Sequence, residues 1–197
     1  MFYLNKMIGE MCKSPHLNEM INLKNTINCN VYAEIGVLYG GSLIEQMKDD
    51  KECYFIGIDP FTGYYGSSYD PHRQVDLTEH IDIVKQNLSS NNPHNHEWEL
   101  IKNKSNDAVK DVERLLELNN QKIDFLFIDG DHSYQGVIDD FYNYKDLISD
   151  HGVLVFDNYK DPNWREVETA VKYIIDNNDY MIQSEFGHCC VLHKKKT

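Results

Sequence analysis

The sequence lacks any long apolar run and has almost no clustering of basic residues. A membrane-spanning helix needs about 20 mostly apolar residues. No segment approaches that length, and the N-terminus shows no apolar stretch typical of a signal peptide. With 32 acidic against 19 basic residues, the net charge of −13 argues against binding the backbone of a nucleic acid. We therefore expect a cytoplasmic protein whose partners include neither a membrane nor a nucleic acid.

Cysteine pairs, internal repeats and dinucleotide-binding signatures are also lacking. The five cysteines are scattered without a CxxC pair, as expected in a reducing compartment. We predict that Cys53 and Cys189 are small core residues. Neither a repeat nor a linker divides the sequence, so we expect one domain over residues 1–197. The absence of a GxGxxG motif disfavours an NAD-dependent oxidoreductase.

The sequence does contain a regular alternation of apolar strands and helical patterns. Strands are predicted at residues 31–36, 53–59, 98–102, 123–129, 153–157, 180–185 and 189–193. Helices are predicted at about 1–27, 42–47, 75–88, 107–118, 134–148 and 164–176. Such alternation is typical of parallel sheets, whereas the last two strands follow each other through a turn. The predicted fold class is α/β: a seven-stranded, mostly parallel sheet with a C-terminal antiparallel hairpin and helices on both faces.

Polar side chains follow two of these strands at the points where the strands end. Asp129 ends one apolar strand, and Asp157 and Asn158 end the next. In an open α/β sheet, ligands bind at the carboxyl ends of the strands. Oxygen donors from two adjacent strand ends would suit a hard divalent cation such as Mg²⁺.

Two further acids lie near the ends of the first two strands. Glu34 precedes a glycine-rich turn that begins at Gly36, and Asp59 ends the second strand. Glu34 is placed to hold the ammonium of an amino-acid-like cofactor, and Asp59 to accept hydrogen bonds from a ribose. The alternatives are a glycine turn needed only for packing and a turn aspartate beside Pro60. Together the acids favour an adenosyl ligand without separating NAD from S-adenosylmethionine.

These motifs resemble those of class I S-adenosylmethionine-dependent methyltransferases. The resemblance is closest to the group labelled methyltransferase family 24, and the chain is similar to catechol-type and antibiotic-sugar O-methyltransferases. It covers roughly residues 30–195 and implies a Rossmann-like sheet. The motifs that carry it are AEIGVLYGGS (33–42), FIGIDPF (55–61), LIKNKSND (100–107), FLFIDGDHSYQGVIDD (125–140) and GVLVFDNY (152–159).

The resemblance implies which residues bind the cofactor and a metal ion. The residues implied to bind S-adenosylmethionine, from its methionine end through the ribose to the adenine, are Glu34, Gly36, Ser42, Asp59, Ser105 and Asn106, with Asp129 beside the metal. The residues implied to bind Mg²⁺ or a similar cation are Asp129, Asp157 and Asn158. The ion would hold the acceptor's oxygens and lower the pKa of a bound hydroxyl.

The catalytic base has two candidates. Catechol-type relatives use a lysine shortly after the first metal aspartate, whereas this chain has Gly130-Asp131-His132 at that place. In sugar-modifying relatives the second aspartate of DGD is the base, which implies Asp131. His132 competes because its ordinary pKa suits proton transfer near neutrality. The structural alternative for His132 is a helix cap or a partner of Asp131.

Two segments outside these motifs are assigned to the surroundings of the site. The Tyr- and Gly-rich stretch at residues 60–75 is expected to close over the site, and residues 1–28 to form a helical extension. Both offer surface for a homodimer, which we leave open. Four other titratable residues are expected to be solvated or at the surface, namely His94, His96, Asp139 and Asp140.

The sequence thus predicts an S-adenosylmethionine-dependent, divalent-metal-assisted O-methyltransferase. Its acceptor would be a hydroxyl of a small molecule, either a sugar or a catechol-like diol. One alternative is a metal-independent small-molecule methyltransferase of the same fold. Another is a non-catalytic adenosyl-binding partner of another enzyme. The acids Asp129, Asp131 and Asp157 speak against the latter, because packing needs no such set of carboxylates at strand ends.

Overall fold

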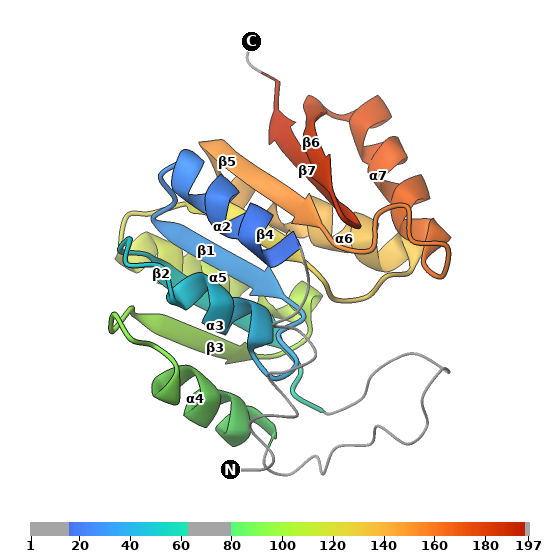
Figure 1. Ribbon diagram of the computed structural model, residues 1–197. Coiled ribbons are helices and arrows are strands. Elements are labelled where there is room, and N and C mark those ends of the chain that lie inside the picture. The colour runs from blue at the N-terminus through green and yellow to red at the C-terminus, as the bar shows by residue number, and fades with distance from the viewer. Residues whose placement is uncertain (1–15, 63–79, 196–197) are drawn as a thin grey trace.

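The computed structural model describes residues 16–62 and 80–195, in which a seven-stranded sheet lies between two layers of helices (Figure 1). The strands are β1 (Val31–Ile35), β2 (Tyr54–Asp59), β3 (Trp98–Lys102), β4 (Ile123–Ile128), β5 (Ile148–Phe156), β6 (Tyr180–Phe186) and β7 (Cys189–Lys194). The helices are α2 (His16–Thr26), α3 (Gly41–Met47), α4 (His80–Ser90), α5 (Ser105–Leu118), α6 (Tyr134–Tyr144), the 3-10 turn η1 (Lys145–Leu147) and α7 (Arg165–Asn177). Most of the predicted 60–75 loop and residues 1–15 of the predicted extension lie outside the described residues.

The strand pairing confirms the predicted fold class. The order across the sheet is β3-β2-β1-β4-β5-β7-β6. The first five strands in the chain pair in parallel, and β7 runs antiparallel to both β5 and β6. All six residues of β4 are buried. A strand covered by helices on both faces needs apolar side chains throughout, which explains its continuous apolar run.

Alternate side chains of the central strands enter two separate layers of the core, because successive residues of a strand point to opposite faces. Tyr32 and Phe125 pack with helices α2, α3 and α4, and their rings stack at a centroid distance of 5.0 Å. Val31 and Leu126 pack with α5, α6 and α7 on the other face. This alternation decides the face on which each polar residue of β1 and β4 lies.

The boundary between α6 and β5 differs from the prediction. The helix predicted at 134–148 ends at Tyr144, and β5 begins at Ile148, earlier than its apolar run indicated. Ile148 pairs with Ile123 across a register shift. A Cβ added to Gly152 would lie 2.7 Å from Ile148 Cγ2 and 2.9 Å from the Ile123 oxygen. The polar residues after Ile148 carry no strand pattern, so only tertiary pairing reveals the early start.

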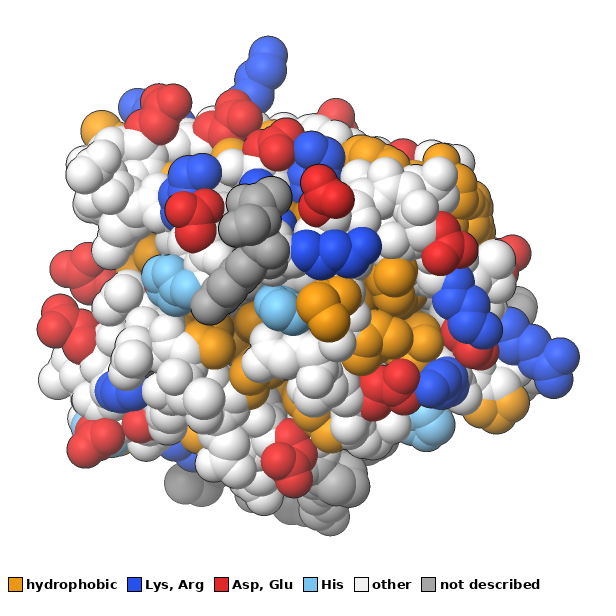
Figure 2. Space-filling model, turned by 90° about the horizontal axis from the view of Figure 1, so that it is seen from above, with side chains coloured by type: hydrophobic (Ala, Val, Ile, Leu, Met, Phe, Trp, Pro, Cys, Tyr) orange, Lys and Arg blue, Asp and Glu red, His pale blue; other side chains and the backbone are white. Residues whose placement is uncertain are grey.

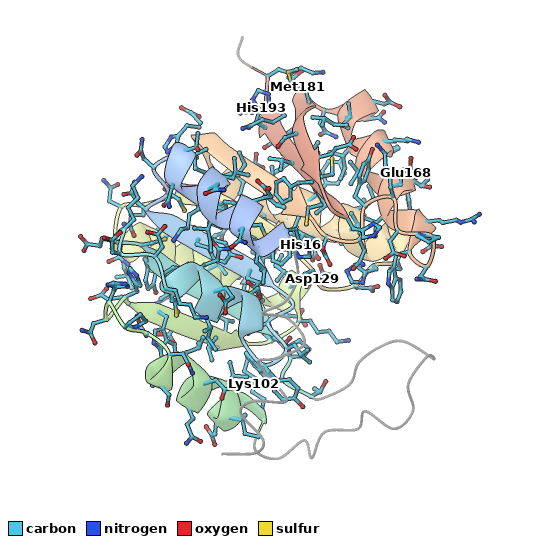
Figure 3. All side chains as sticks on the ribbon, viewed as in Figure 1. His16, Lys102, Asp129, Glu168, Met181 and His193 are labelled. Carbon is cyan, nitrogen blue, oxygen red and sulfur yellow. The ribbon has the colours of Figure 1, made fainter. Side chains whose placement is uncertain are left out.

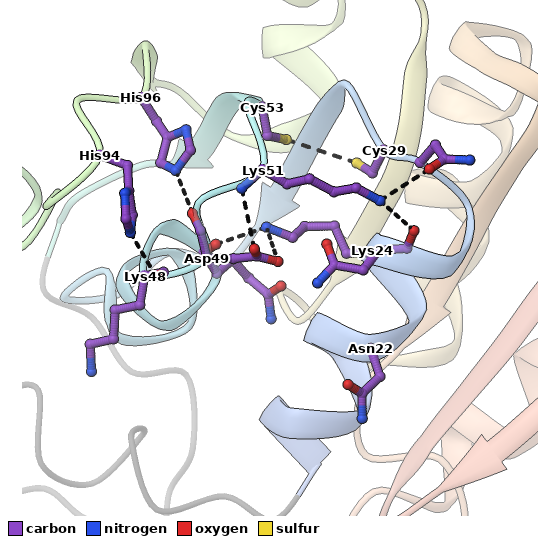
Figure 4. Close-up of polar contacts among 12 residues, drawn as sticks. Asn22, Lys24, Cys29, Lys48, Asp49, Lys51, Cys53, His94 and His96 are labelled. Atoms are coloured by element: carbon purple, nitrogen blue, oxygen red, sulfur yellow. Dashed lines mark hydrogen bonds and ion pairs between the residues drawn. The ribbon is translucent and has the colours of Figure 1, made fainter.

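A buried lysine anchors α2 to the rest of the layer (Figure 4). Lys24 is only 1% exposed, and its Nζ donates a hydrogen bond of 2.9 Å to the Gln46 carbonyl oxygen. The same Nζ lies 3.6 Å from the Asp49 carboxylate. From the other side, Lys51 Nζ donates to the Asn25 carbonyl oxygen at 2.7 Å. These contacts hold the C-terminal half of α2 against α3 and the segment that follows it.

One of the two histidines expected at the surface is buried, so that expectation is wrong for His96. His96 is 7% exposed, and its Nε2 lies 2.8 Å from the Asp49 carbonyl oxygen (Figure 4). Its ring packs edge-on against Phe55. His94 is exposed, with Nε2 3.2 Å from the Lys48 carbonyl oxygen. The turn before β3 folds over the end of α3, which encloses one ring and leaves the other outside.

The outer surface is of mixed character. In the view of Figure 2, acidic, basic and hydrophobic side chains are interspersed. The edge strand β6 exposes Met181 and Ile182. The longest described helix, α5, has 14 residues. Throughout residues 16–62 and 80–195, every helix is too short or too polar to cross a membrane.

Candidate active site

The ends of β4 and β5 bring two predicted metal ligands together. The Asp157 N–H donates to the Ile128 carbonyl oxygen at 3.0 Å, and the Asp129 N–H donates to the Ile35 carbonyl oxygen at 2.9 Å. The two acids therefore leave the sheet at the same level. A carboxylate oxygen of Asp129, one of Asp157 and a ring nitrogen of His132 all lie within 4.8 Å of one another. The structure thus brings together, at the carboxyl edge, three side chains whose donor atoms could hold a metal ion.

The charges of this group are poorly compensated. Burial and, to a lesser extent, the charge of Asp157 raise the pKa of Asp129 to about 7, although His132 opposes the shift. Burial would lower the pKa of His132, but the Asp129 carboxylate, 3.2 Å from Nε2, and the charge of Asp157 raise it overall. Two carboxylates that repel each other in a partly buried position favour a cation between them.

The sequence left open that His132 is a helix cap or a partner of Asp131, and the structure gives it a different environment. The cap of α6 is Ser133, whose hydroxyl accepts a backbone N–H of the first turn. The exposed Asp131 accepts the Ser133 N–H through Oδ1 at 2.9 Å. The His132 ring instead approaches Asp129 and tilts against Trp164 at 4.9 Å between centroids. His132 is therefore part of the acidic group and neither caps the helix nor pairs with Asp131.

The third predicted metal ligand, Asn158, occupies a strained turn directly after Asp157. Its φ of 55° lies in the left-handed region. Its Nδ2 is 3.5 Å from Asp161 Oδ2, and the next backbone N–H, of Tyr159, donates to the His188 carbonyl oxygen at 2.7 Å. A non-glycine residue in this region is uncommon and is held by its surroundings. Metal binding by Asn158 stays a prediction.

Glu34 is fully enclosed on the α2–α4 side of the sheet. It is 0% exposed, and its carboxylate accepts hydrogen bonds from the Ser42 hydroxyl and, at 3.0 Å, from the Tyr32 hydroxyl. Burial raises its pKa to about 8, with Ser42 and Tyr32 opposing the shift and the charges of Asp129 and Asp59 adding to it. The structure joins Glu34 to Ser42, and their contact with a cofactor stays a prediction.

Asp59 organises the turns beside Glu34. Its Oδ2 accepts the Leu38 N–H at 3.0 Å, and its Oδ1 accepts the Phe61 N–H at 2.6 Å. Asp59 is therefore a turn aspartate, and a contact with a ribose stays a prediction. Gly36 is required nearby, because its φ is 92° and a Cβ there would lie 2.0 Å from the Asp129 carbonyl oxygen. The glycine turn at Gly36 and the turn that begins at Asp129 are thus in direct backbone contact.

The predicted adenine edge is held by α6. The Tyr144 hydroxyl donates to the Ser105 carbonyl oxygen at 2.8 Å, and Asn143 Nδ2 donates to Asn106 Oδ1 at 2.7 Å. Ser105 and Asn106 are the first two residues of α5. The structure therefore gives both residues a fixed position at the carboxyl edge beyond β3, and their contact with adenine stays a prediction.

The expectation that Asp140 is solvated is wrong. Asp140 is 2% exposed, hydrogen-bonds the Ser105 side chain, and has a pKa raised by burial to about 7. The sequence did carry a signal for this position. Val137, Phe141 and Tyr144 form the buried stripe of α6, and position 140 falls on that stripe at helical spacing.

Two residues near the site were not identified as site residues from the sequence. A ring nitrogen of His16, the Cys189 sulfur and a carboxylate oxygen of Asp157 lie within 4.8 Å of one another. Cys189 is buried, as predicted, but its Sγ also lies 3.4 Å from Asp157 Oδ1. The pairing of β7 with β5 places Cys190 opposite Phe156 and so brings Cys189 to this edge. No local pattern marks His16, which arrives through the packing of α2 (Figure 3).

The pKa values of this second group reflect its enclosure. Burial raises the pKa of Cys189 well above its ordinary value, and the adjacent Asp157 carboxylate raises it further. Burial lowers the pKa of His16, against the opposing charge of Asp157. Asp157 thus stands between two groups of side chains, one with Asp129 and His132 and one with His16 and Cys189.

Comparisons with known proteins agree with this architecture. The family described as a methyltransferase domain matches residues 33–159, well over half of the chain. The uncharacterized protein R132 of Acanthamoeba polyphaga mimivirus is 34% identical over 163 residues. That alignment covers 81% of this chain, which spans only 66% of the length of this curated relative.

Solved methyltransferases share the fold at low sequence identity. A structure from Staphylococcus aureus, described as a candidate caffeoyl-CoA O-methyltransferase, has a TM-score of 0.66 and 17% identity, covering 93% of this chain and 84% of its own. An O-methyltransferase from Bacillus cereus in complex with SAH (S-adenosylhomocysteine) has a TM-score of 0.63 and 18% identity, covering 93% and 82%. With the family match, these findings confirm the predicted resemblance: the chain belongs to the class I S-adenosylmethionine-dependent methyltransferases, in the family of this methyltransferase domain.

Proposed function

We propose that this protein transfers the methyl group of S-adenosylmethionine to a hydroxyl of a small molecule, assisted by a divalent cation. The observation that carries the proposal is the approach of Asp129 and Asp157, whose carboxylate oxygens lie within 4.8 Å of each other beside His132. Both acids stand at the carboxyl edge of the sheet, where ligands of open α/β folds bind. Both also fall within the segment that matches the methyltransferase family.

The cofactor is proposed to lie along the ends of β1, β2 and β3, with its methyl group toward Asp129. The residues proposed to line it are Glu34, Gly36, Ser42, Asp59, Ser105, Asn106 and Asp129. The raised pKa of the buried Glu34 supports this, because a positive ammonium group nearby would stabilise its ionised form. Asp59 can also accept ribose hydroxyls, since each carboxylate oxygen has two lone pairs and accepts one N–H.

The divalent cation is proposed to be held by Asp129, Asp157 and Asn158. When bound, an ion such as Mg²⁺ would polarise the acceptor hydroxyl and orient it toward the methyl group. The oxygen donor set fits this class of ion. The raised pKa of Asp129, caused by burial and by Asp157, supports the assignment, because a cation would offset the repulsion between the two carboxylates.

Asp131 is the base that we propose. Its side chain is exposed at the edge, and one carboxylate oxygen is anchored by the Ser133 N–H. His132 is less suited, because its raised pKa and its contact with Asp129 favour the protonated ring. In the reaction, the acceptor oxygen forms a bond to the methyl carbon while the carbon–sulfur bond breaks. The hydroxyl proton passes to the Asp131 carboxylate, and the positive sulfonium becomes a neutral thioether.

The acceptor class that we propose is a sugar or a catechol-like diol. Two vicinal oxygens would allow the acceptor to bind the cation at both, which fixes the reacting hydroxyl in one orientation. The two solved neighbours named above are both described as O-methyltransferases. A panel of nucleotide sugars, free sugars and catechols, with methyl-labelled S-adenosylmethionine, would identify which of these classes is methylated.

Calorimetric titration of SAH into the chelated protein, without and with Mg²⁺, tests the proposal. We expect SAH binding in the wild-type protein and a Mg²⁺ heat that the double variant Asp129→Ala/Asp157→Ala loses. The matched control is Asp150→Ala/Asp176→Ala, which removes two exposed acids away from this edge. Absence of SAH binding would contradict the cofactor assignment. Full turnover in EDTA would instead favour a metal-independent enzyme, and SAH binding without turnover on the panel would favour a non-catalytic partner protein.

A further inference from the structure

A second set of potential metal ligands adjoins the acidic pair. His16 begins α2, Asp157 follows β5, and Cys189 begins β7. One ring nitrogen, one carboxylate oxygen and the sulfur of these residues lie within 4.8 Å of one another. Figure 3 shows His16 and Asp129 on the same side of the molecule, next to the ends of the central strands. Residues far apart in the sequence thus present nitrogen, oxygen and sulfur donors at one point.

We propose that His16, Asp157 and Cys189 bind one divalent ion of borderline softness, of the Zn²⁺ or Co²⁺ type. This donor set differs from the all-oxygen set of Asp129, Asp157 and Asn158, although both include Asp157. The proposal goes beyond methyl transfer and does not rest on it. Its test below has a readout that is independent of the cofactor and of turnover.

The chemistry of the donors selects this class of ion. Thiolate sulfur and imidazole nitrogen are preferred ligands of Zn²⁺ and its neighbours among the transition metals. Mg²⁺ takes oxygen ligands and gains little from a cysteine or a histidine. Three protein ligands leave a fourth tetrahedral position open for water or another small ligand.

The distance between two of the donors already matches such a site. Cys189 Sγ lies 3.4 Å from Asp157 Oδ1. In a tetrahedral site with Zn–S near 2.3 Å and Zn–O near 2.0 Å, these two atoms would be about 3.5 Å apart. The ion could therefore be accommodated without separating the strands that carry the two residues. Cys189 is buried and His16 is half-buried, so the sulfur is shielded while the site is open on its histidine side.

Ion binding would replace the proton of the Cys189 thiol. The Sγ–H now points to Asp157, and the ion would take the sulfur as a thiolate while the proton passes to the solvent. No oxidation or reduction accompanies this exchange. The ion would also tie the first residue of α2 to the sheet edge, whereas the other end of α2 is held by Lys24. Binding should therefore raise the thermal stability of the protein.

Cobalt absorption spectroscopy on the chelated full-length chain tests the proposal. Co²⁺ bound to a thiolate shows a sulfur-to-metal charge-transfer band in the near ultraviolet, and we expect this band in the wild-type protein. The band should disappear in Cys189→Ser. The matched control is Cys190→Ser, since Cys190 is equally buried but packs in the opposite core layer, away from Asp157. The control should keep the band, and excess Mg²⁺ should not abolish it.

A second variant keeps the proposal testable if Cys189→Ser does not fold, as judged by circular dichroism. His16→Ala should weaken Co²⁺ binding about tenfold or more and reduce the rise in melting temperature that Zn²⁺ or Co²⁺ causes. No charge-transfer band in the wild type, or an unchanged band and affinity in both variants, would overturn the proposal. SAH titration in parallel separates the two proposals, because loss of SAH binding with an intact cobalt band would contradict methyl transfer alone.

Discussion

Asp124 and Asp129 lie at opposite ends of β4, and their carboxylates have partners of different kinds. Asp124 Oδ2 accepts two backbone N–H groups at the start of β1, at 2.9 and 3.3 Å, and Oδ1 accepts the Ser149 hydroxyl at 2.6 Å. Asp129 instead faces Asp157 and has a pKa raised to about 7 by burial and by that neighbour. One strand thus carries a hydrogen-bonded structural acid at its amino end and, at its carboxyl end, a candidate ligand that lies beside a second carboxylate and His132.

Replacing Asp124 should destabilise the fold without affecting ligand binding directly. In Asp124→Ala, the backbone N–H groups at the start of β1 would lose their acceptor inside the protein. We expect a loss of about 3 kcal/mol in the free energy of unfolding, measured by urea denaturation. The nearby exposed Asp150→Ala should change stability by at most about 0.5 kcal/mol. A loss of less than about 1 kcal/mol in Asp124→Ala would show that water replaces the lost acceptor.

The enclosed Glu34 should make stability depend on pH. Because its folded-state pKa is raised from 4.5 to about 8, the folded protein keeps a proton that the unfolded chain has released. The contribution of Glu34 to stability is therefore greatest at acidic pH and falls as the pH rises through this window. The free energy of unfolding of Glu34→Gln, relative to that of the wild type, should therefore increase between about pH 5 and pH 8. The increase should be on the order of 1–3 kcal/mol.

Urea denaturation of Glu34→Gln and wild type at both ends of this pH range measures that difference. The variant also alters the hydrogen bonds to Ser42 and Tyr32, which changes stability at every pH. The test is therefore how the stability difference between variant and wild type changes with pH, and not its absolute size. Glu117→Gln removes an exposed glutamate and serves as the control. An equal stability difference at both pH values would mean that Glu34 is ionised in the folded protein throughout.

Asp140 should act as a positioning residue for the proposed adenine edge. It touches Ser105, the first residue of α5, and does not itself belong to the predicted cofactor contacts. Asp140→Ala should weaken SAH binding about tenfold, equivalent to about 1.4 kcal/mol, while Asp140→Asn should retain most of the affinity. Asp139→Ala, at the adjacent and more exposed position, is the control. Equal SAH affinities of Asp139→Ala and Asp140→Ala would contradict a positioning role for Asp140.

The contact between the glycine turn at Gly36 and the turn that begins at Asp129 should tolerate no side chain. Gly36→Ala would place a Cβ 2.0 Å from the Asp129 carbonyl oxygen at a φ of 92°. We expect the variant to lose more than about 3 kcal/mol of stability and, where it folds, to lose SAH and Mg²⁺ binding together.

Gly130→Ala provides the comparison for this variant. A Cβ there would meet the side chain of Ile35 at 3.0 Å, with no backbone atom nearer than 4.0 Å. In thermal denaturation, the melting temperature should therefore fall less for Gly130→Ala than for Gly36→Ala. The reverse order would show that the two turns separate easily, so that their contact does not couple the proposed cofactor and metal sites.

Much of the fold and part of the site were predictable because the relevant signals are local. The apolar run that ends at Asp129 predicted a doubly covered strand, and the turn after residue 185 predicted the terminal hairpin. Strand ends of a parallel sheet meet at one edge, so the proximity of Asp129 to Asp157 followed from the strands alone. The burial of Asp140 was within reach of the same reasoning, because its helical spacing was visible.

Other features depended on contacts between elements far apart in the chain. His96 is buried because a turn folds over the end of α3. β5 begins earlier than predicted because Ile148 pairs with Ile123 of β4. The polar sequences at both places carry no periodicity that would predict either outcome. Burial of a polar group depends on whether a distant segment supplies its hydrogen-bond partner, which local pattern does not encode.

The sequence by itself determined the strands, the helices and the acids at the strand ends, since periodicity and turn chemistry act over a few residues. Only the tertiary structure decided that Glu34 is enclosed by Ser42 and Tyr32, and that His16 and Cys189 meet at Asp157. The last of these meetings requires the packing of α2 on the sheet and the pairing of β7 with β5. Such contacts arise because helices and strands bury their apolar faces against one another. This packing brings together polar side chains that belong to no common sequence motif.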